Sequence, residues 1–504
     1  VGRHATADLA ALAVGGSAYI TIFIGLMGVV LAVSPIVGRL CGAQQWREAG
    51  HQFWQALWLA AALSLLGSTL LVFPEPFLAL AKASPATEVK VRHYLLALAC
   101  SLPASLVFTV FRGFNTAVSR PRTVMLLQLG GLALKVPLSL ALVDGLPALG
   151  IPPLGVVGCG IGTMLAMWTQ ALMAVALMRR DGFYRRFELG APGQRAPQWH
   201  SLRALLKLGI PMGLGIAVEV TAFSAMVLFI SRVSETAVAG HQIALNLVSL
   251  VFMLPMGLAN GTSTLVAQRI GANDLGDAHR LGVHGLQFTF GLALAVGAVI
   301  FFGRHQVVAL YTHEPAVAAV TVSLLAWVAL FHAADAVQTL TAFVLRAWHV
   351  ATLPMLVYVL ALWGVGLGGG NWLAFNLGGQ TPADWQGARG FWIASTAGLI
   401  LAALLLTSLM VWTTGERSAS VGGASIGPSS GRATCSAAHS SAVGMRTPRS
   451  ISPSSTAVRP AWAASTRSGS PTRSRSSRSW RPGPRRPETS RRLTAAACGA
   501  VKLM

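Results

Sequence analysis

Eleven long apolar segments decide which folds this chain can adopt. Each reaches or exceeds the roughly 20 residues that a helix needs to cross a bilayer. None alternates like a barrel strand, and a helix satisfies its own backbone hydrogen bonds in lipid. The sequence therefore predicts an all-α polytopic membrane protein. The segments cover about residues 8–37, 51–73, 93–111, 123–143, 156–178, 208–231, 237–267, 283–303, 317–345, 351–377 and 390–412.

The loops between these segments are unequal in charge. One set of loops holds fifteen Lys and Arg residues and the opposite set holds seven. Because basic loops stay in the cytoplasm, the richer side is predicted to be cytoplasmic, with Val1 outside. The chain begins at Val rather than Met and shows no signal peptide. We expect one further helix before Val1.

Two halves of the chain repeat each other. At an offset of 229, Met27-Gly28 matches Met256-Gly257 and Gly42-Ala43 matches Gly271-Ala272, whereas Arg112 matches Arg346 at an offset of 234. Many secondary transporters are built from such repeats, with the substrate path between them. We expect two pseudo-symmetric six-helix lobes, the first lacking its first helix. The predicted parts are an N-lobe at 1–180, a cytoplasmic inter-lobe loop at 181–207 and a C-lobe at 208–412.

The remaining stretch, 413–504, has a different composition. It is rich in Ser, Arg, Pro, Ala and Gly. It contains fifteen Lys and Arg residues and two acids, Glu416 and Glu488, so it contributes +13 of the net charge of +22. Such a basic run can bind nucleic acid or anionic lipid. A disordered low-complexity tail, or an out-of-frame extension, is the preferred interpretation because this composition cannot build a core. No nucleic-acid partner is expected.

Two carboxylates lie in the middle of apolar segments, Glu219 and Asp335. A charge in the bilayer costs several kcal/mol, so an acid there indicates a functional site. Polar, aromatic or thioether side chains accompany the pair at helical spacing, and interhelical hydrogen bonding is the structural alternative for the polar ones. The candidate substrate or cation-site residues are Phe223, Met226, Gln242, Asn246, Phe331, His332, Gln338 and Thr339.

Several motifs resemble the multidrug and toxic compound extrusion (MATE) family, in particular its NorM-like branch. They are Leu208-Gly-Ile-Pro-Met212, Ala237-Val-Ala-Gly-His-Gln-Ile-Ala-Leu-Asn246, Leu254-Pro-Met-Gly257, Arg269-Ile-Gly-Ala272, Asp335-Ala-Val-Gln338 and Leu345-Arg346. The resemblance covers about residues 1–412. It implies a monomer of twelve helices in two lobes, placed in the bacterial inner membrane and in contact with its lipids. It also implies export of drugs or organic cations in exchange for H⁺ or Na⁺.

Within that pattern, Glu219 and Asp335 are the expected coupling residues. Apart from Na⁺ at these two acids, no metal and no cofactor is expected. A tyrosine commonly stands four residues before the second acid, where this chain has Phe331. The loss of this hydroxyl ligand favours H⁺ over Na⁺ without excluding Na⁺. The family's absent first helix usually carries a further aspartate.

Three other functions remain open at this point. A lipid-linked oligosaccharide flippase of the same superfamily would need a broad basic cavity, and only Lys135 is intramembrane. A membrane-embedded enzyme using His332 with Asp335 lacks a catalytic spacing. The chain contains no Walker A or HExxH motif, and no enzyme activity is expected. The third alternative is an inactive truncated transporter.

Overall fold

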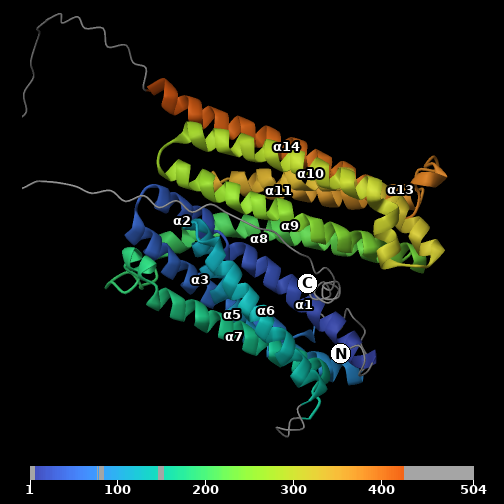
Figure 1. Cartoon of the computed structure of the whole chain (residues 1–504), viewed down its shortest axis with the longest axis horizontal. Coiled ribbons are helices and arrows are strands. Elements are labelled where there is room, and N and C mark those ends of the chain that lie inside the picture. The colour runs from blue at the N-terminus through green and yellow to red at the C-terminus, as the bar shows by residue number, and fades with distance from the viewer. Residues whose placement is uncertain (1–5, 76–77, 79–84, 146–151, 425–504) are drawn as a thin grey trace, which may run out of the picture. The chain divides into compact units, whose positions relative to one another are not determined.

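The computed structural model describes residues 6–75, 78, 85–145 and 152–424, and these are almost entirely helical (Figure 1). The expected tail lies outside the described residues from 425 onward, but its first twelve positions continue the last helix to Ala424. The helices are α1 (Thr6–Val30), α2 (Val33–Gly42), α3 (Trp46–Val72), α5 (Pro85–Ala117), α6 (Pro121–Asp144), α7 (Gly155–Arg180), α8 (Trp199–Ile230), α9 (Glu235–Gly271), α10 (Leu275–Tyr311), α11 (Pro315–Ala347), α12 (Thr352–Tyr358), α13 (Gly369–Ala374) and α14 (Ala388–Ala424), with shorter segments η2 (Gly182–Phe187), η3 (Val359–Gly368) and η4 (Ala383–Trp385).

All eleven predicted spans are confirmed as helical segments long and apolar enough to cross a membrane. Two of them are not continuous α-helices. The first breaks between α1 and α2 at Leu31 and Ala32, because the ring of Pro35 clashes with the carbonyl four residues earlier. The tenth runs from α12 through the π-helical segment η3 into α13. Such π-segments are frequent at functional sites.

Two large hydrophobic cores divide the helices into an N-lobe (α1–α7) and a C-lobe (α8–α14). One core gathers residues of α1, α2, α3, α5, α7 and the start of α8, and the other gathers residues of α8–α14. Helix α6 packs against α5 and α7 in a smaller cluster. Helix α8 belongs to both large cores, since Leu205, Leu208 and Met212 pack into the first core whereas Met226 and Ile230 pack into the second. The chain thus passes between the lobes along α8.

The backbone confirms the repeat most directly at two pairs of turns. Gln44 and Asn273 both have positive φ (59° and 61°), and so do Ser119 and His349 (61° and 59°). Within each pair, three backbone hydrogen bonds that close the turn recur at matching residues. The offsets are 229 and 230. The second turn therefore places Arg346 opposite Thr116, one helical turn from the Arg112 that sequence matching paired with it.

The inter-lobe loop is shorter than expected and is docked on the N-lobe. Helix α8 begins at Trp199 rather than at 208, which leaves 181–198 as the connection. Side chains of α3 donate hydrogen bonds to its carbonyls: the Trp54 indole to Leu189 O (3.0 Å) and the Gln55 amide to Ala196 O (2.7 Å). This connection is therefore held against α3.

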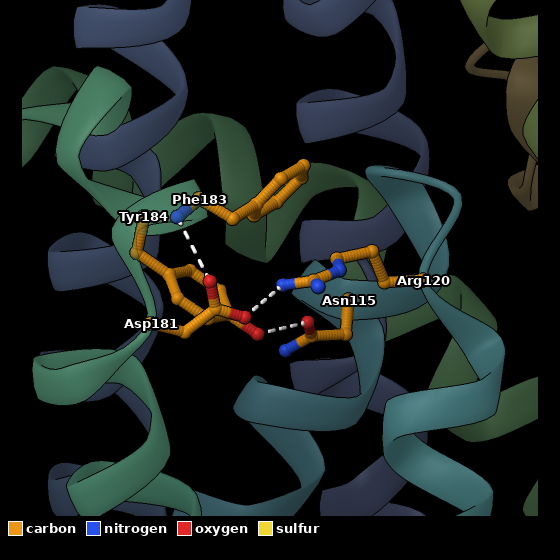
Figure 2. Close-up of polar contacts among 5 residues, drawn as sticks. All are labelled: Asn115, Arg120, Asp181, Phe183 and Tyr184. Atoms are coloured by element: carbon orange, nitrogen blue, oxygen red, sulfur yellow. Dashed lines mark hydrogen bonds and ion pairs between the residues drawn. The ribbon is translucent and has the colours of Figure 1, made fainter.

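A polar cluster fixes the start of the connection (Figure 2). Asp181 accepts a hydrogen bond from the backbone N–H of Phe183 (2.9 Å) and pairs with Arg120, while the Tyr184 hydroxyl donates to Asn115 Oδ1 (2.6 Å). The N–H of Phe183, and then Arg120, lower the pKa of Asp181 below its ordinary value. The carboxylate thus joins α7 to the turn after α5.

Candidate functional site

The two intramembrane carboxylates lie on different helices of the C-lobe and contact the same amide. Gln338 Nε2 lies 2.9 Å from Asp335 Oδ1 and 3.4 Å from Glu219 Oε1, and it also lies 3.1 Å from the hydroxyl of Thr339. Glu219 comes from α8, and the other three residues come from α11. The structure therefore brings together four of the predicted site residues in one cluster.

Burial differs between the two acids. Asp335 is 4% exposed and Gln338 is fully buried, whereas Glu219 is half-buried. Two carboxylates this close repel each other unless a proton or a cation lies between them. Among the described side chains, Gln338 Oε1 is buried without a hydrogen-bond partner. It offers an acceptor for a protonated carboxyl group, or an oxygen ligand for a small cation.

An aromatic wall stands beside the carboxylates. The rings of Phe223 and Phe331 meet edge to face with centroids 6.0 Å apart, and Phe331 lies 5.2 Å from Trp392. The Trp392 indole donates to Nδ1 of the buried His241 (3.1 Å). Sequence reasoning missed His241 and Trp392. The available signal was a histidine inside an apolar segment, His241, directly before Gln242.

A small cavity separates α8 from the π-segment η3. It measures about 10 Å³, room for roughly one water molecule. Met226 accepts a hydrogen bond from the Ser395 hydroxyl at 3.5 Å, and the Trp363 indole donates to Val218 O (3.1 Å), one residue before Glu219. The residues that line this cavity are Ala222, Phe223, Met226, Leu362, Gly366, Leu367, Ser395 and Leu399.

The polar residues predicted on α9 do not join the cluster. Gln242 is exposed, and Asn246 accepts a hydrogen bond from the Tyr311 hydroxyl of α10 (3.0 Å). The core-facing positions of α9 include His241, Ala244 and Val248 instead. Asn246 therefore makes an interhelical hydrogen bond, the structural alternative for these polar side chains, and a role of Gln242 and Asn246 in substrate binding stays a prediction.

His332 is buried on α11, with 1% of its surface exposed. Its Nδ1 is without a hydrogen-bond partner among the described residues, and the hydrogen bond recorded for the Asp335 carboxylate comes from Gln338. The proposed pairing of His332 with Asp335 for enzyme chemistry therefore gains no support. In the described part of the chain, no group of three His, Cys, Asp or Glu side chains could hold a metal ion.

A much larger cavity of about 690 Å³ lies away from the carboxylates, between the α2–α3 turn and the docked connection. Arg47 and Glu188 pair across it at 3.7 Å. His51 contributes Nδ1 to a contact with Gln194 O (3.1 Å). The cavity is lined from the N-lobe and the connection alone. It therefore cannot provide the path between the lobes.

Comparison with known proteins decides the family. The family model described as MatE matches residues 1–141 and 211–370, which is more than half of the chain. The chain belongs to the MATE family. It is a multi-pass protein of the bacterial inner membrane, as the eleven spans in its described residues and its bacterial relatives indicate.

Relatives extend over most of this MATE chain. A probable multidrug resistance protein NorM of Aromatoleum aromaticum is 40% identical over 81% of this chain and 87% of its own length. The multidrug resistance protein PmpM of Pseudomonas aeruginosa is 34% identical over 80% and 84%. A solved MATE structure in the straight conformation aligns with a TM-score of 0.73 at 18% identity, over 84% and 91%. The eukaryotic MATE transporter AtDTX14 aligns at 0.71 and 19%, over 83% and 92%. These structures show the shared fold.

Proposed function

We propose that this protein exports cationic or amphipathic organic compounds in exchange for H⁺ or Na⁺ by alternating access. The observation that carries the proposal is the amide of Gln338 between Glu219 and Asp335, two carboxylates on different helices of one lobe. The names of the NorM and PmpM relatives support drugs as the substrates. We further propose that the protein acts as a monomer, surrounded by membrane lipid.

The aromatic residues beside the acids suit the proposed substrates. Phe223 is half-buried and packs on Phe331, so it can present a ring face to a flat cation, a contact worth about 0.5–2 kcal/mol. Met226 adds a polarisable thioether. Negative charge and aromatic surface on the same helix α8 favour an organic cation over an anion.

The coupling ion is proposed to be H⁺ in the first place. Phe331 brings no hydroxyl to the cluster, whereas Na⁺ requires several oxygen ligands. A protonated carboxyl group needs only one acceptor, and Gln338 Oε1, which has no partner among the described residues, would supply it once the amide is turned over. The energy is sufficient, because each charge contributes about 2.3 kcal/mol per 100 mV and each proton about 1.4 kcal/mol per pH unit.

The proposal predicts that Glu219→Gln and Asp335→Asn each abolish export, since both keep the side-chain shape and remove the ionisable group. Ethidium efflux from an efflux-deficient bacterial host measures this, with membrane quantities of each variant determined in parallel. Gln128→Leu, at an exposed α6 position outside the candidate site, is the matched control and should keep wild-type efflux. Wild-type efflux from either acid variant would overturn the coupling assignment.

A further inference from the structure

Two side chains cross between the lobes at the cytoplasmic ends of α2 and α9. The Arg39 guanidinium of the N-lobe donates from Nε (2.8 Å) and Nη2 (2.6 Å) to the carbonyl of Ala347 in the C-lobe. The Gln268 amide of the C-lobe donates to the carbonyl of Ala117 (2.8 Å) and the hydroxyl of Ser119 (3.0 Å) in the N-lobe. Each lobe therefore sends one side chain into the other.

The two contacts are symmetry mates. Gln268 stands 229 residues after Arg39, and Ala347 stands 230 residues after Ala117, which are the offsets of the repeated turns. Both accepting carbonyls belong to the final residue of a helix, α5 or α11. The last four carbonyls of a helix have no partner within it, and the helix dipole makes this end favourable for a cation. The repeat thus provides the same acceptor twice.

Glycines bring the backbones together at the same place. A Cβ on Gly42 would lie 1.8 Å from Gln268 O, and a Cβ on Gly271 would lie 1.8 Å from Arg39 O. The carbonyls of the two bridging residues therefore sit against the glycine of the opposite lobe. A hydrogen bond is lost beyond about 3.5 Å, so a separation of only a few ångströms here breaks both contacts.

We propose that Arg39 and Gln268 are paired latches that hold the lobes closed on the cytoplasmic side, and that both release when this side opens to admit substrate. The inference rests on the proposed alternating access. Along α8, the half-buried Glu219 comes after Gly213, which packs against Gly28 of α1. The latches close the path on the side of the basic loops.

Distance measurements between spin labels test the latches without requiring transport. Cysteines placed at Arg122 and Thr352, exposed residues at the cytoplasmic starts of α6 and α12, report on lobe separation in a background without the native cysteines. Arg39→Met and Gln268→Met remove the donating groups; methionine keeps the side-chain length at 268 and the aliphatic stem at 39. We expect the ratio of long to short distances to rise by roughly tenfold or more for Arg39→Met and by roughly three- to tenfold for Gln268→Met.

Arg269→Ala is the matched control. Arg269 neighbours Gln268, but it pairs with Asp277 inside the C-lobe (2.9 Å), so its loss should leave the distances unchanged. If Arg39→Met does not fold, Gln268→Met alone carries the test. Unchanged distances in a folded latch variant, a shift in only one of the two, or an equal shift in the control overturns the proposal. Failed ion coupling with shifted distances would overturn the proposed function and leave the latches standing.

Discussion

The two lobes share the turns at the end predicted to be cytoplasmic and differ inside the membrane. At the offset of 230 that relates the second pair of turns, Asp335 and Thr339 of α11 are equivalent to Ser105 and Thr109 of α5. The N-lobe hydroxyls donate to carbonyls of their own helix, Ser105 to Ser101 O (3.0 Å) and Thr109 to Ser105 O (2.9 Å). The C-lobe positions instead hold a carboxylate and the hydroxyl that neighbours Gln338. The repeated backbone serves as scaffold in both lobes, and in the described chain the proposed coupling chemistry lies in the C-lobe.

Moving the acid from one lobe to the other should produce the largest effect. The double variant Asp335→Ser with Ser105→Asp keeps the number of intramembrane acids but separates the new one from Glu219 and Gln338. We expect export to fall to background, whereas Ser105→Ala alone should stay within about twofold of wild type. Its hydroxyl donates to Ser101 O of its own helix, and its contact with the Tyr19 hydroxyl of α1 is long, at 3.5 Å. Ethidium efflux measures both. Efflux retained by the double variant would show that the position of the acid is unimportant.

The symmetric glycines should show the next largest effect, and the lobes should respond alike. Gly42→Ala and Gly271→Ala each place a methyl group on a backbone carbonyl of the other lobe. Overpacking of this kind costs about 1–3 kcal/mol, and more where backbone must move. Both variants should lower the thermal unfolding temperature.

Gly261→Ala is the control for these substitutions, because a Cβ there meets nothing within 4 Å. It should leave the unfolding temperature unchanged or raise it slightly. Thermal unfolding of the three purified variants, followed by intrinsic fluorescence, makes the comparison. A large loss for one glycine of the pair and none for the other would break the symmetry of the interface.

The smallest effect concerns the connection, which is docked on one lobe only. Asp181→Asn weakens the pairing with Arg120 and should raise hydrogen exchange in 181–187 slightly. Because the pKa of Asp181 is below its ordinary value, the wild-type contact is complete above that ordinary value and is lost as the pH falls through the lowered one. The exchange difference between variant and wild type should vanish below that pH. A difference that persists there would mean that another interaction holds the segment.

Sequence reasoning identified what depends on hydrophobicity and charge along the chain. The eleven spans and the carboxylate pair stand out because apolar length and intramembrane acids are unmistakable in lipid. The partner of Asn246 on α9 did not, because it is the Tyr311 hydroxyl of another helix, 65 residues away in the sequence. Nor did the contacts of Arg39 and Gln268, since their acceptors are backbone carbonyls about 150 or 300 residues away. A backbone carbonyl is the same in every residue, so a contact with it leaves no pattern in the sequence.

The most direct test of the account records drug and ion together in proteoliposomes that contain the purified protein. An imposed H⁺ or Na⁺ gradient should drive ethidium against its own gradient, and an ethidium gradient should in turn move the coupling ion. A trapped pH dye and a Na⁺ tracer report which ion moves. Asp335→Asn should abolish both movements in protein that remains folded. Uphill ethidium movement that persists in Asp335→Asn, or that ignores both ion gradients, would contradict the claim that the C-lobe carboxylates exchange drug for ion.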